Sequence, residues 1–257
     1  MATRAKVLPL LLGEADVSKQ LDIIWSLSRE REIITVPILG FAILVNDQVL
    51  IVDTGFRNAE RCTTVQHLGP HRTQPEWSVA QQLARWGIAP HQVSMVVLTH
   101  LHYDHAGGLS AFPNAQIVVQ RLEVQAAAAP VVSRALDVGG HALFYDRLDV
   151  ADVVSTYWDR LVLLEGDEEI APGVRCVLYA NSHTPGTQVV YVDTADGRIA
   201  LLGDLARNVH LNIEEELVPG IYYDLESTRR ALRDVKRSAD LYVPAHDYAV
   251  MHLLENR

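Results

Sequence analysis

The motif HxHxDH at residues 100–105 constrains this chain most, because it directly follows an apolar run that favours a buried strand. Alternate side chains of an extended segment point the same way, so His100 and His102 can bind one cation. The turn that follows can direct Asp104 and His105 toward a second cation. Imidazole and carboxylate ligands suit zinc, with iron, manganese and cobalt as alternatives. A solvated histidine-rich loop is the alternative, but this order of residues rarely arises by chance.

The composition indicates a globular protein. Of 257 residues, 49% are hydrophobic and 21% charged, which excludes a disordered chain, a collagen and a coiled coil. A chain of this length buries enough surface to fold without disulfides. No linker-like segment divides it, so we expect a single domain over residues 1–257. Residues 121–160 are the least regular part, and we expect them to form a helical insertion or lid.

The charge balance and the cysteines exclude several classes of partner. With 22 basic and 32 acidic residues the net charge is −10, which disfavours nucleic acid as a partner. No stretch approaches the roughly 20 apolar residues that span a bilayer, and the apolar run 7–12 is too short for a signal peptide. Cys62 and Cys176 are too few for a disulfide framework. We therefore expect a cytoplasmic protein that binds neither nucleic acid nor a membrane.

Short β-rich runs alternate with helical patterns along the chain. Strands are predicted at Lys6–Leu12, Ile38–Val45, Gln48–Val52, Val93–Leu98, Gln116–Gln120, Val174–Leu178, Gln188–Val192, Ile199–Leu202 and Leu241–Val243. Helices are predicted at Trp77–Trp86 and Leu225–Lys236. Strands dominate each half with helices between them, which favours two sheets packed face to face and covered by helices.

An HxHxDH motif after a hydrophobic strand resembles the signature of the metallo-β-lactamase superfamily. The other elements of that family occur in the same order, at Asp53 in VDTG, His183 in NSHTPG, Asp204 in LGD and His246 in PAHD. The resemblance runs from about Lys6 to His246, nearly the whole chain. It implies an α+β fold, an αββα sandwich of two mixed β-sheets flanked by helices.

The resemblance also implies a dinuclear centre for two divalent metal ions, with Zn²⁺ favoured over Fe, Mn or Co. The implied ligands are His100, His102 and His183 for one ion, Asp104, His105 and His246 for the other, and Asp204 as the bridge. Asp53 is expected to bond loop backbone beside the site rather than to bind metal. Two cations lower the pKa of a bridging water, so a hydroxide is available at neutral pH for hydrolysis.

Within the superfamily, the segments 100–108, 112–121 and 165–174 resemble those of the acyl-homoserine lactone lactonases. The resemblance implies a hydrolase with a small-molecule substrate, a lactone whose ring is opened by attack of a metal-bridging hydroxide. Asp104 would pass a proton to the leaving oxygen. Other branches share parts of these segments. Two alternatives therefore stay open: a thioesterase of the hydroxyacylglutathione hydrolase type, and a metal-binding regulatory protein without hydrolytic activity.

Two positions depart from the lactonase pattern. Thr187 stands where the family usually has a second histidine that is not a ligand, so metal binding should survive. Arg207 stands where these lactonases carry a tyrosine, and a guanidinium can bind a carboxylate with two hydrogen bonds. One hypothesis is that Arg207 selects an anionic substrate; the other is that it faces solvent or pairs with a residue of Glu214–Glu216.

Residues outside the motifs leave further expectations. Tyr222 and Tyr223 can either supply a phenol to bind substrate or serve as packing residues, and packing is favoured. The histidines His67, His71, His91 and His252 match no element of the family and are expected at the surface. Exposed apolar residues in the region 121–160 would make a homodimer reasonable.

Overall fold

The computed structural model describes residues 5–19, 32–64, 69–128 and 144–255. Its strands are β1 (Lys6–Ser18), β2 (Ile33–Val45), β3 (Gln48–Val52), β4 (His71–Arg72), β5 (Val93–Val97), β6 (Gln116–Gln120), β7 (Leu161–Leu164), β8 (Glu168–Ala171), β9 (Val174–Leu178), β10 (Gln188–Thr194), β11 (Gly197–Gly203) and β12 (Leu241–Pro244). Its α-helices are α1 (Ala59–Thr64), α2 (Val79–Ala84), α3 (Tyr103–Ala106), α4 (Arg121–Ala128), α6 (Arg147–Val154), α7 (Leu225–Ser238) and α8 (Ala249–Glu255). Single 3-10 turns are η3 (Pro75–Trp77), η4 (Pro90–Gln92), η5 (Leu109–Ala111) and η8 (Trp158–Arg160), and η9 (Val209–Glu214) is a short π-helix.

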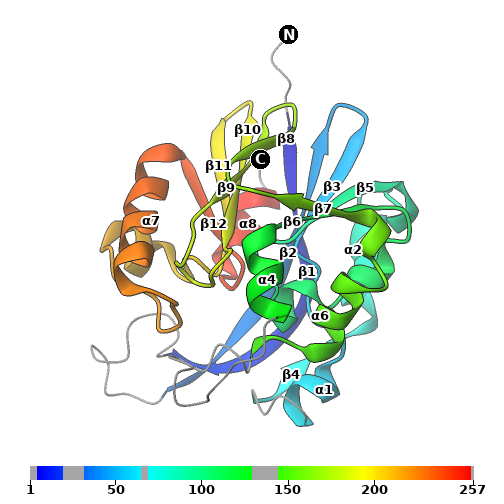
Figure 1. The fold of residues 1–257 in the computed structure, drawn as a ribbon, viewed down its shortest axis with the longest axis horizontal. Coiled ribbons are helices and arrows are strands. Elements are labelled where there is room, and N and C mark those ends of the chain that lie inside the picture. The colour runs from blue at the N-terminus through cyan, green and yellow to red at the C-terminus, as the bar shows by residue number, and fades with distance from the viewer. Residues whose placement is uncertain (1–4, 20–31, 65–68, 129–143, 256–257) are drawn as a thin grey trace.

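Two mixed sheets form the centre of the molecule (Figure 1). The seven-stranded sheet has the order β4-β1-β2-β3-β5-β6-β7, and the five-stranded sheet has the order β12-β11-β10-β9-β8. Strands β3, β5, β6 and β7 run parallel, so their carboxyl ends meet at one edge of the first sheet. The loop that carries HxHxDH leaves β5 at this edge.

Three apolar clusters hold the layers together. One lies between the two sheets and includes Phe41, Leu50 and Val190. A second packs α2 and α6 against the outer face of the seven-stranded sheet, and a third packs Leu232 and Val235 of α7 against the five-stranded sheet. The predicted αββα sandwich is therefore confirmed. Among the described residues, no helix is both long and apolar enough to cross a bilayer.

The N-terminal strands are longer than the sequence pattern predicts. β1 continues through the polar residues after Leu12 to Ser18, because a bulge between Leu11 and Gly13 keeps it paired with β2. β2 correspondingly begins at Ile33 rather than Ile38. Pairing across the sheet thus extends both strands past the points where their apolar runs end.

Other boundaries also differ. The helix predicted at Trp77–Trp86 is divided into η3 and α2, because Ser78 is extended and its side chain caps α2 by accepting from the Gln81 N–H. Strands β7 and β8 and helix α8 were not predicted. In the region 121–160, residues 129–143 lie outside the described part of the chain, while α4 and α6 belong to the connection from β6 to its parallel neighbour β7. A lid function for this region stays a prediction, as does the single-domain boundary.

Candidate metal centre

The HxHxDH loop is held against a neighbouring loop by close backbone contacts. The Thr54 N–H donates to the His105 carbonyl at 2.7 Å, and the Gly107 N–H donates to the Gly55 carbonyl at 2.8 Å. A Cβ atom on Gly107 would lie 2.1 Å from the backbone nitrogen of Arg57, so only glycine permits this close approach of the two loops. Gly107 and Gly108, which follow the motif, therefore let the two loops pack closely in addition to letting the chain turn.

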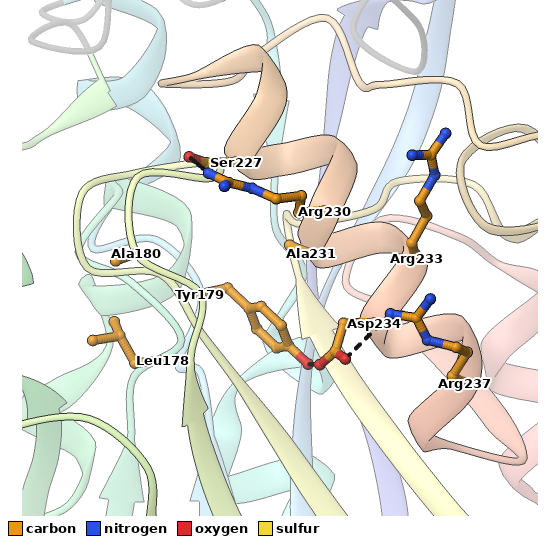
Figure 2. Close-up of a pocket in the computed structure, with 9 residues that line it drawn as sticks. All are labelled: Leu178, Tyr179, Ala180, Ser227, Arg230, Ala231, Arg233, Asp234 and Arg237. Atoms are coloured by element: carbon orange, nitrogen blue, oxygen red, sulfur yellow. Dashed lines mark hydrogen bonds and ion pairs between the residues drawn. The ribbon is translucent and has the colours of Figure 1, made fainter.

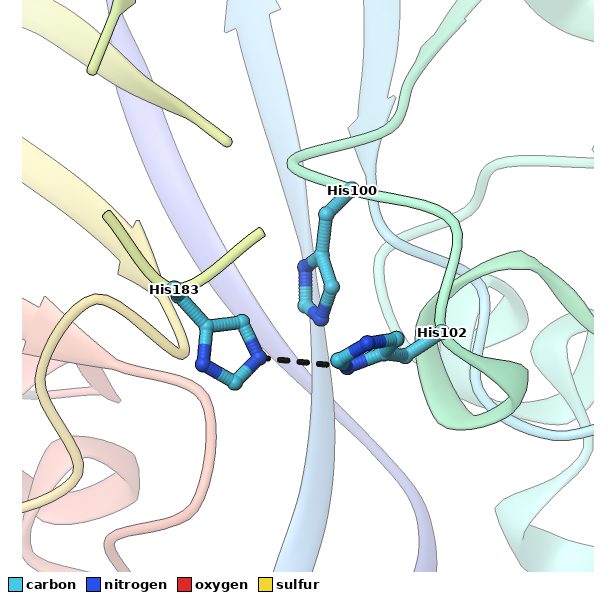
Figure 3. Close-up of side chains that lie close together, drawn as sticks. All are labelled: His100, His102 and His183. Carbon is cyan, nitrogen blue, oxygen red and sulfur yellow. Dashed lines mark hydrogen bonds between the residues drawn. The ribbon is translucent and has the colours of Figure 1, made fainter. Parts of the chain in front are cut away.

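His100, His102 and His183 converge on one point from two different loops (Figure 3). His183 lies between β9 and β10 of the five-stranded sheet, whereas the other two follow β5. The His183 Nε2 and His102 Nδ1 atoms are 3.1 Å apart. Two nitrogens bound to one tetrahedral zinc at 2.0–2.1 Å are separated by about 3.3 Å, so the three buried imidazoles are spaced for a shared cation.

Asp104, His105 and His246 form a second group beside the first. The His246 Nε2 lies 3.4 Å from Asp104 Oδ2, and the His105 Nε2 lies 3.7 Å from Asp104 Oδ1. His246 follows β12, so this group also takes its members from both sheets.

Asp204, at the end of β11, lies between the two groups. Its Oδ1 atom is 2.8 Å from His246 Nε2 and 3.4 Å from His105 Nε2. Its Oδ2 atom is 3.7 Å from His183 Nε2. One carboxylate oxygen thus faces each group, which is the arrangement that a bridging ligand needs.

The outward-facing nitrogen of each of four imidazoles contacts an oxygen. His105 Nδ1 lies 2.8 Å from Asp53 Oδ2, His246 Nδ1 lies 2.9 Å from the Pro37 carbonyl, His183 Nδ1 lies 3.2 Å from the Ile221 carbonyl and His100 Nδ1 lies 3.0 Å from Thr99 Oγ1. Histidines that bind metals are characteristically oriented in this way. In the described part of the chain, the buried His100 Nε2 has no hydrogen-bond partner. The donor set and its orientation therefore fit two divalent cations.

Burial and neighbouring charges set the protonation of these groups. Burial, reinforced by His105 and His102, lowers the pKa of His100 well below its ordinary value, which favours the neutral imidazole that binds metal. Burial acts to raise the pKa of Asp204, but His246 and His105 outweigh it and hold the pKa well below the ordinary value. Asp204 is therefore an ionised carboxylate.

Asp53 contacts a histidine of the site rather than facing the point where a cation would bind. Its Oδ1 accepts from the Thr99 N–H at 2.8 Å, and its Oδ2 accepts from the Thr99 hydroxyl at 2.8 Å besides contacting His105. Asp53 has a φ of +59°, a left-handed conformation that Asp tolerates better than most residues. This turn places the carboxylate within hydrogen-bonding distance of Thr99 and His105.

Arg207 lies inside the site. Its side chain is 4% exposed, and its Nη1 lies 3.3 Å from Asp204 Oδ2. Its backbone N–H donates to Asn212 Oδ1 at 2.8 Å, which fixes the turn into η9. The carboxylate of Glu216 instead contacts Arg233 and Lys236. The guanidinium therefore lies buried beside Asp204 at the metal centre rather than in solvent.

The two tyrosines lie in different surroundings. Tyr222 packs against the apolar cluster beneath α7. Tyr223 is 49% exposed, and its N–H donates to the Ser182 carbonyl at 2.6 Å, next to His183. A substrate-binding role for either phenol stays a prediction.

Residues outside the motifs also lie near the site: the sequence left open whether Phe144 and Tyr145 line the pocket, and it did not single out Glu123. Phe144 and Tyr145 place their rings 5.3 and 4.9 Å from His102, and Glu123 is fully buried beneath the same loop. His71 was expected at the surface, but it is buried with its Nε2 2.8 Å from the Tyr103 hydroxyl. Short-range patterns carry no signal for these contacts, since the partners come together only through the sheets. His67 lies outside the described residues.

A surface depression of about 440 Å³ lies elsewhere, between α7 and the end of β9 (Figure 2). It shares no residue with the histidine groups. Its charged side chains have partners within the protein: Asp234 accepts from the Tyr179 hydroxyl at 2.7 Å and lies 3.7 Å from Arg237, and Arg233 contacts Glu216. No chemistry comparable to that of the metal centre is gathered there.

Comparison with known proteins gives a consistent result. Residues 36–246 match the family model of the metallo-beta-lactamase superfamily. The N-acyl homoserine lactonase AiiA of Bacillus thuringiensis subsp. kurstaki is 28% identical over 228 residues, which cover 84% of this chain and 83% of that protein. The N-acyl homoserine lactonase AiiB of Agrobacterium fabrum is 27% identical over 162 residues, which cover 60% of this chain and 57% of that protein.

Solved structures share the fold. An N-acyl homoserine lactone hydrolase with N-hexanoyl-L-homoserine bound at its catalytic metal centre matches with a TM-score of 0.77 at 23% identity, over 97% of this chain and 95% of that chain. AidC, a dizinc quorum-quenching lactonase, matches with a TM-score of 0.71 at 16% identity, over 96% of this chain and 88% of that chain.

Proposed function

The chain belongs to the metallo-β-lactamase superfamily, and we propose that it is a dinuclear metal-dependent hydrolase that opens lactone rings. The observation that carries the proposal is the pair of buried ligand groups joined by Asp204. The relatives that are similar over most of the chain are N-acyl homoserine lactonases, which favours a cyclic ester as substrate. A complete donor set argues for an enzyme rather than a regulatory binding protein.

In this proposal His100, His102 and His183 hold one divalent cation, and Asp104, His105 and His246 hold the other, with Asp204 shared. When bound, two such cations supply a hydroxide nucleophile at neutral pH and Lewis acidity toward the ester carbonyl. The burial of the ligand side chains limits access of bulk water, which strengthens electrostatic interactions within the site.

The protein's own groups then complete the reaction. Addition of hydroxide to the carbonyl carbon forms one C–O bond, and the ring C–O bond breaks to leave an alkoxide oxygen. Asp104, whose carboxylate is 10% exposed at the edge of the site, can accept the proton that the attacking hydroxide brings and pass it to that oxygen. The product is an open-chain hydroxy acid.

Arg207 supports a narrower substrate class, namely lactones with a negatively charged substituent. A guanidinium binds a carboxylate by two charge-assisted hydrogen bonds, and burial beside Asp204 places that capacity within the centre. Because hydrogen bonds to charged groups contribute about 1.5–3 kcal/mol, losing this contact would raise KM roughly 10- to 100-fold.

The deciding experiment is hydrolysis of a lactone panel by metal-loaded protein, followed as proton release. The panel contains acyl-homoserine lactones, plain γ- and δ-lactones, lactones with a free carboxylate, and a glutathione thioester as counter-test. Turnover of lactones that stops with chelator and returns with metal supports the proposal. Turnover of the thioester alone would replace it with the thioesterase alternative.

Arg207→Ala separates the substrate classes. We expect KM for carboxylated lactones to rise at least 10-fold while KM for neutral lactones stays unchanged, with metal content measured to confirm an intact centre. Arg229→Ala, on the surface of α7, is the matched control. An unchanged KM for carboxylated lactones would contradict the anionic-substrate proposal and leave the lactonase proposal standing.

Three finer points are also proposed. Zinc is favoured as the native metal because the donor set is rich in imidazole, and elemental analysis of purified protein tests it. The cytoplasm is favoured because Cys62 and Cys176 are buried thiols without a disulfide. A homodimer is testable by sedimentation.

A further inference from the structure

The carboxylate of Glu123 is fully buried and surrounded by hydrogen-bond donors. Its Oε1 accepts from the Leu101 N–H at 2.9 Å and from the Tyr145 hydroxyl at 3.1 Å. Its Oε2 accepts from the Thr184 hydroxyl at 2.7 Å and from the Gly186 N–H at 2.9 Å. Such a side chain is uncommon, because buried glutamates need partners for all their oxygen lone pairs.

These donors belong to the two loops that carry the first group of histidines. Leu101 lies between His100 and His102, and Thr184 directly follows His183. The first loop leaves the seven-stranded sheet and the second connects two strands of the five-stranded sheet. One carboxylate at the start of α4 therefore connects loops from the two layers.

The pattern of donors requires an ionised carboxylate. Four donors match the roughly four lone-pair sites of a carboxylate, whereas an amide nitrogen accepts none. Burial raises the pKa of Glu123, but the hydrogen bonds from Leu101, Thr184, Gly186 and Tyr145 oppose this effect. Replacement by glutamine would therefore put an NH₂ group in place of one carboxylate oxygen, and its N–H groups would face other hydrogen-bond donors.

The loop after His183 packs closely against Glu123. A Cβ atom at Gly186 would lie 2.3 Å from the Glu123 backbone nitrogen, so glycine is required for the approach. Thr184 donates its hydroxyl to the carboxylate, so the Thr187 hydroxyl must donate to Thr184 Oγ1, at 2.8 Å. Thr187 Oγ1 in turn accepts from the Thr184 N–H at 2.8 Å. Thr187 thus completes a local network that ends on Glu123.

We propose that Glu123 is a positioning residue that fixes His100, His102 and His183 at the spacing of a single cation by tying their two loops together. The inference rests on the metal binding of the proposed function. It assigns no contact with substrate to Glu123. Its consequence is selective: the affinity of the first metal position depends on Glu123, and that of the position formed by Asp104, His105 and His246 depends on it much less.

The test is metal affinity, measured by chelator competition with Zn²⁺ on Glu123→Gln and wild type. Loss of a residue that orients metal ligands typically weakens binding by about 10- to 100-fold, and we expect this for one of the two bound ions only. Glu165→Gln is the matched control, because it makes the same change at a carboxylate that is 70% exposed and contacts Arg121 at the start of the same helix. Thermal unfolding of the metal-free proteins is measured alongside.

If Glu123→Gln does not fold, Thr184→Val provides the second test, since it removes one donor and leaves the carboxylate. We expect it to weaken the same single ion at least threefold. Unchanged affinities, or equal weakening of both ions together with a lower melting temperature of the metal-free protein, would overturn the inference. Wild-type protein that binds no metal would instead overturn the proposed function, and with it the basis of the inference.

Discussion

Asp149 on α6 offers a direct measure of what burial of a charge does to the stability of this fold. Asp149 is 2% exposed, and the Arg57 Nε atom lies 2.7 Å from Asp149 Oδ1. The other charged groups that influence it are Asp146, which caps the start of α6, and Asp152 within α6. Burial raises the pKa of Asp149 from 3.8 to about 6, and the contact with Arg57 only partly opposes this shift.

The sign and size of the pH dependence of stability follow from the difference in proton binding between the folded and the unfolded protein. Between pH 4 and 6 the folded protein holds a proton on Asp149 that the unfolded chain has released, so the free energy of unfolding falls as the pH rises. Above pH 6 both states are ionised and the loss is complete. A shift of about 2 pKa units corresponds to about 3 kcal/mol.

The perturbation is Asp149→Asn, which keeps the shape and removes the titration. The free energy of unfolding is measured in urea from pH 4 to pH 8 for metal-free wild type and variant. We expect the stability of the variant relative to wild type to increase by about 3 kcal/mol across this range. The lost contact with Arg57 shifts the whole difference curve but does not change its dependence on pH.

Asp152→Asn is the matched control, because Asp152 contacts the same Arg57 side chain but is 29% exposed. Because Asp152 is the smallest of the causes that raise the pKa of Asp149, its removal should change the pH dependence of stability much less than Asp149→Asn does. If the difference between Asp149→Asn and wild type is independent of pH, then burial does not raise the pKa of Asp149, and the reasoning is refuted.

Three further outcomes are expected. Gly186→Ala should destabilise the protein by about 1–3 kcal/mol in urea unfolding and weaken metal binding, because its Cβ would overlap the Glu123 backbone; unchanged values would show that the loop can move. Burial raises the pKa of Cys62 and of Cys176 to about 12, so a thiol reagent at pH 8 should modify neither in folded protein within minutes and both in denaturant; rapid modification of folded protein would contradict this. Tyr103→Phe should lower the free energy of unfolding by about 1–3 kcal/mol, because His71 Nε2 loses its buried partner, and a change below 0.5 kcal/mol by the same assay would argue against that hydrogen bond.

Local patterns in the sequence were sufficient for much of the fold. Runs of β-branched residues placed β3, β6 and β9 at their observed bounds, because their pattern and their burial agree. The same patterns predict that β1 ends at Leu12, because the pairing with β2 that extends this strand to Ser18 is not visible in a local pattern. They give no clear signal for β7 and β8, which are short strands at sheet edges with half-exposed residues.

By itself the sequence determined which residue types are available for metal binding, because HxHxDH brings four of them together within one loop. Only the tertiary structure decided how the remaining groups meet. His246 Nδ1 reaches the carbonyl of Pro37 from 209 residues away, Asp204 extends one oxygen toward each histidine group, and Glu123 joins loops of two sheets. These contacts depend on strand register and on the stacking of two sheets, and no spacing along the chain encodes either. That packing sets the positions of the side chains around the candidate metal centre, whereas the set of metal-binding residue types is encoded locally.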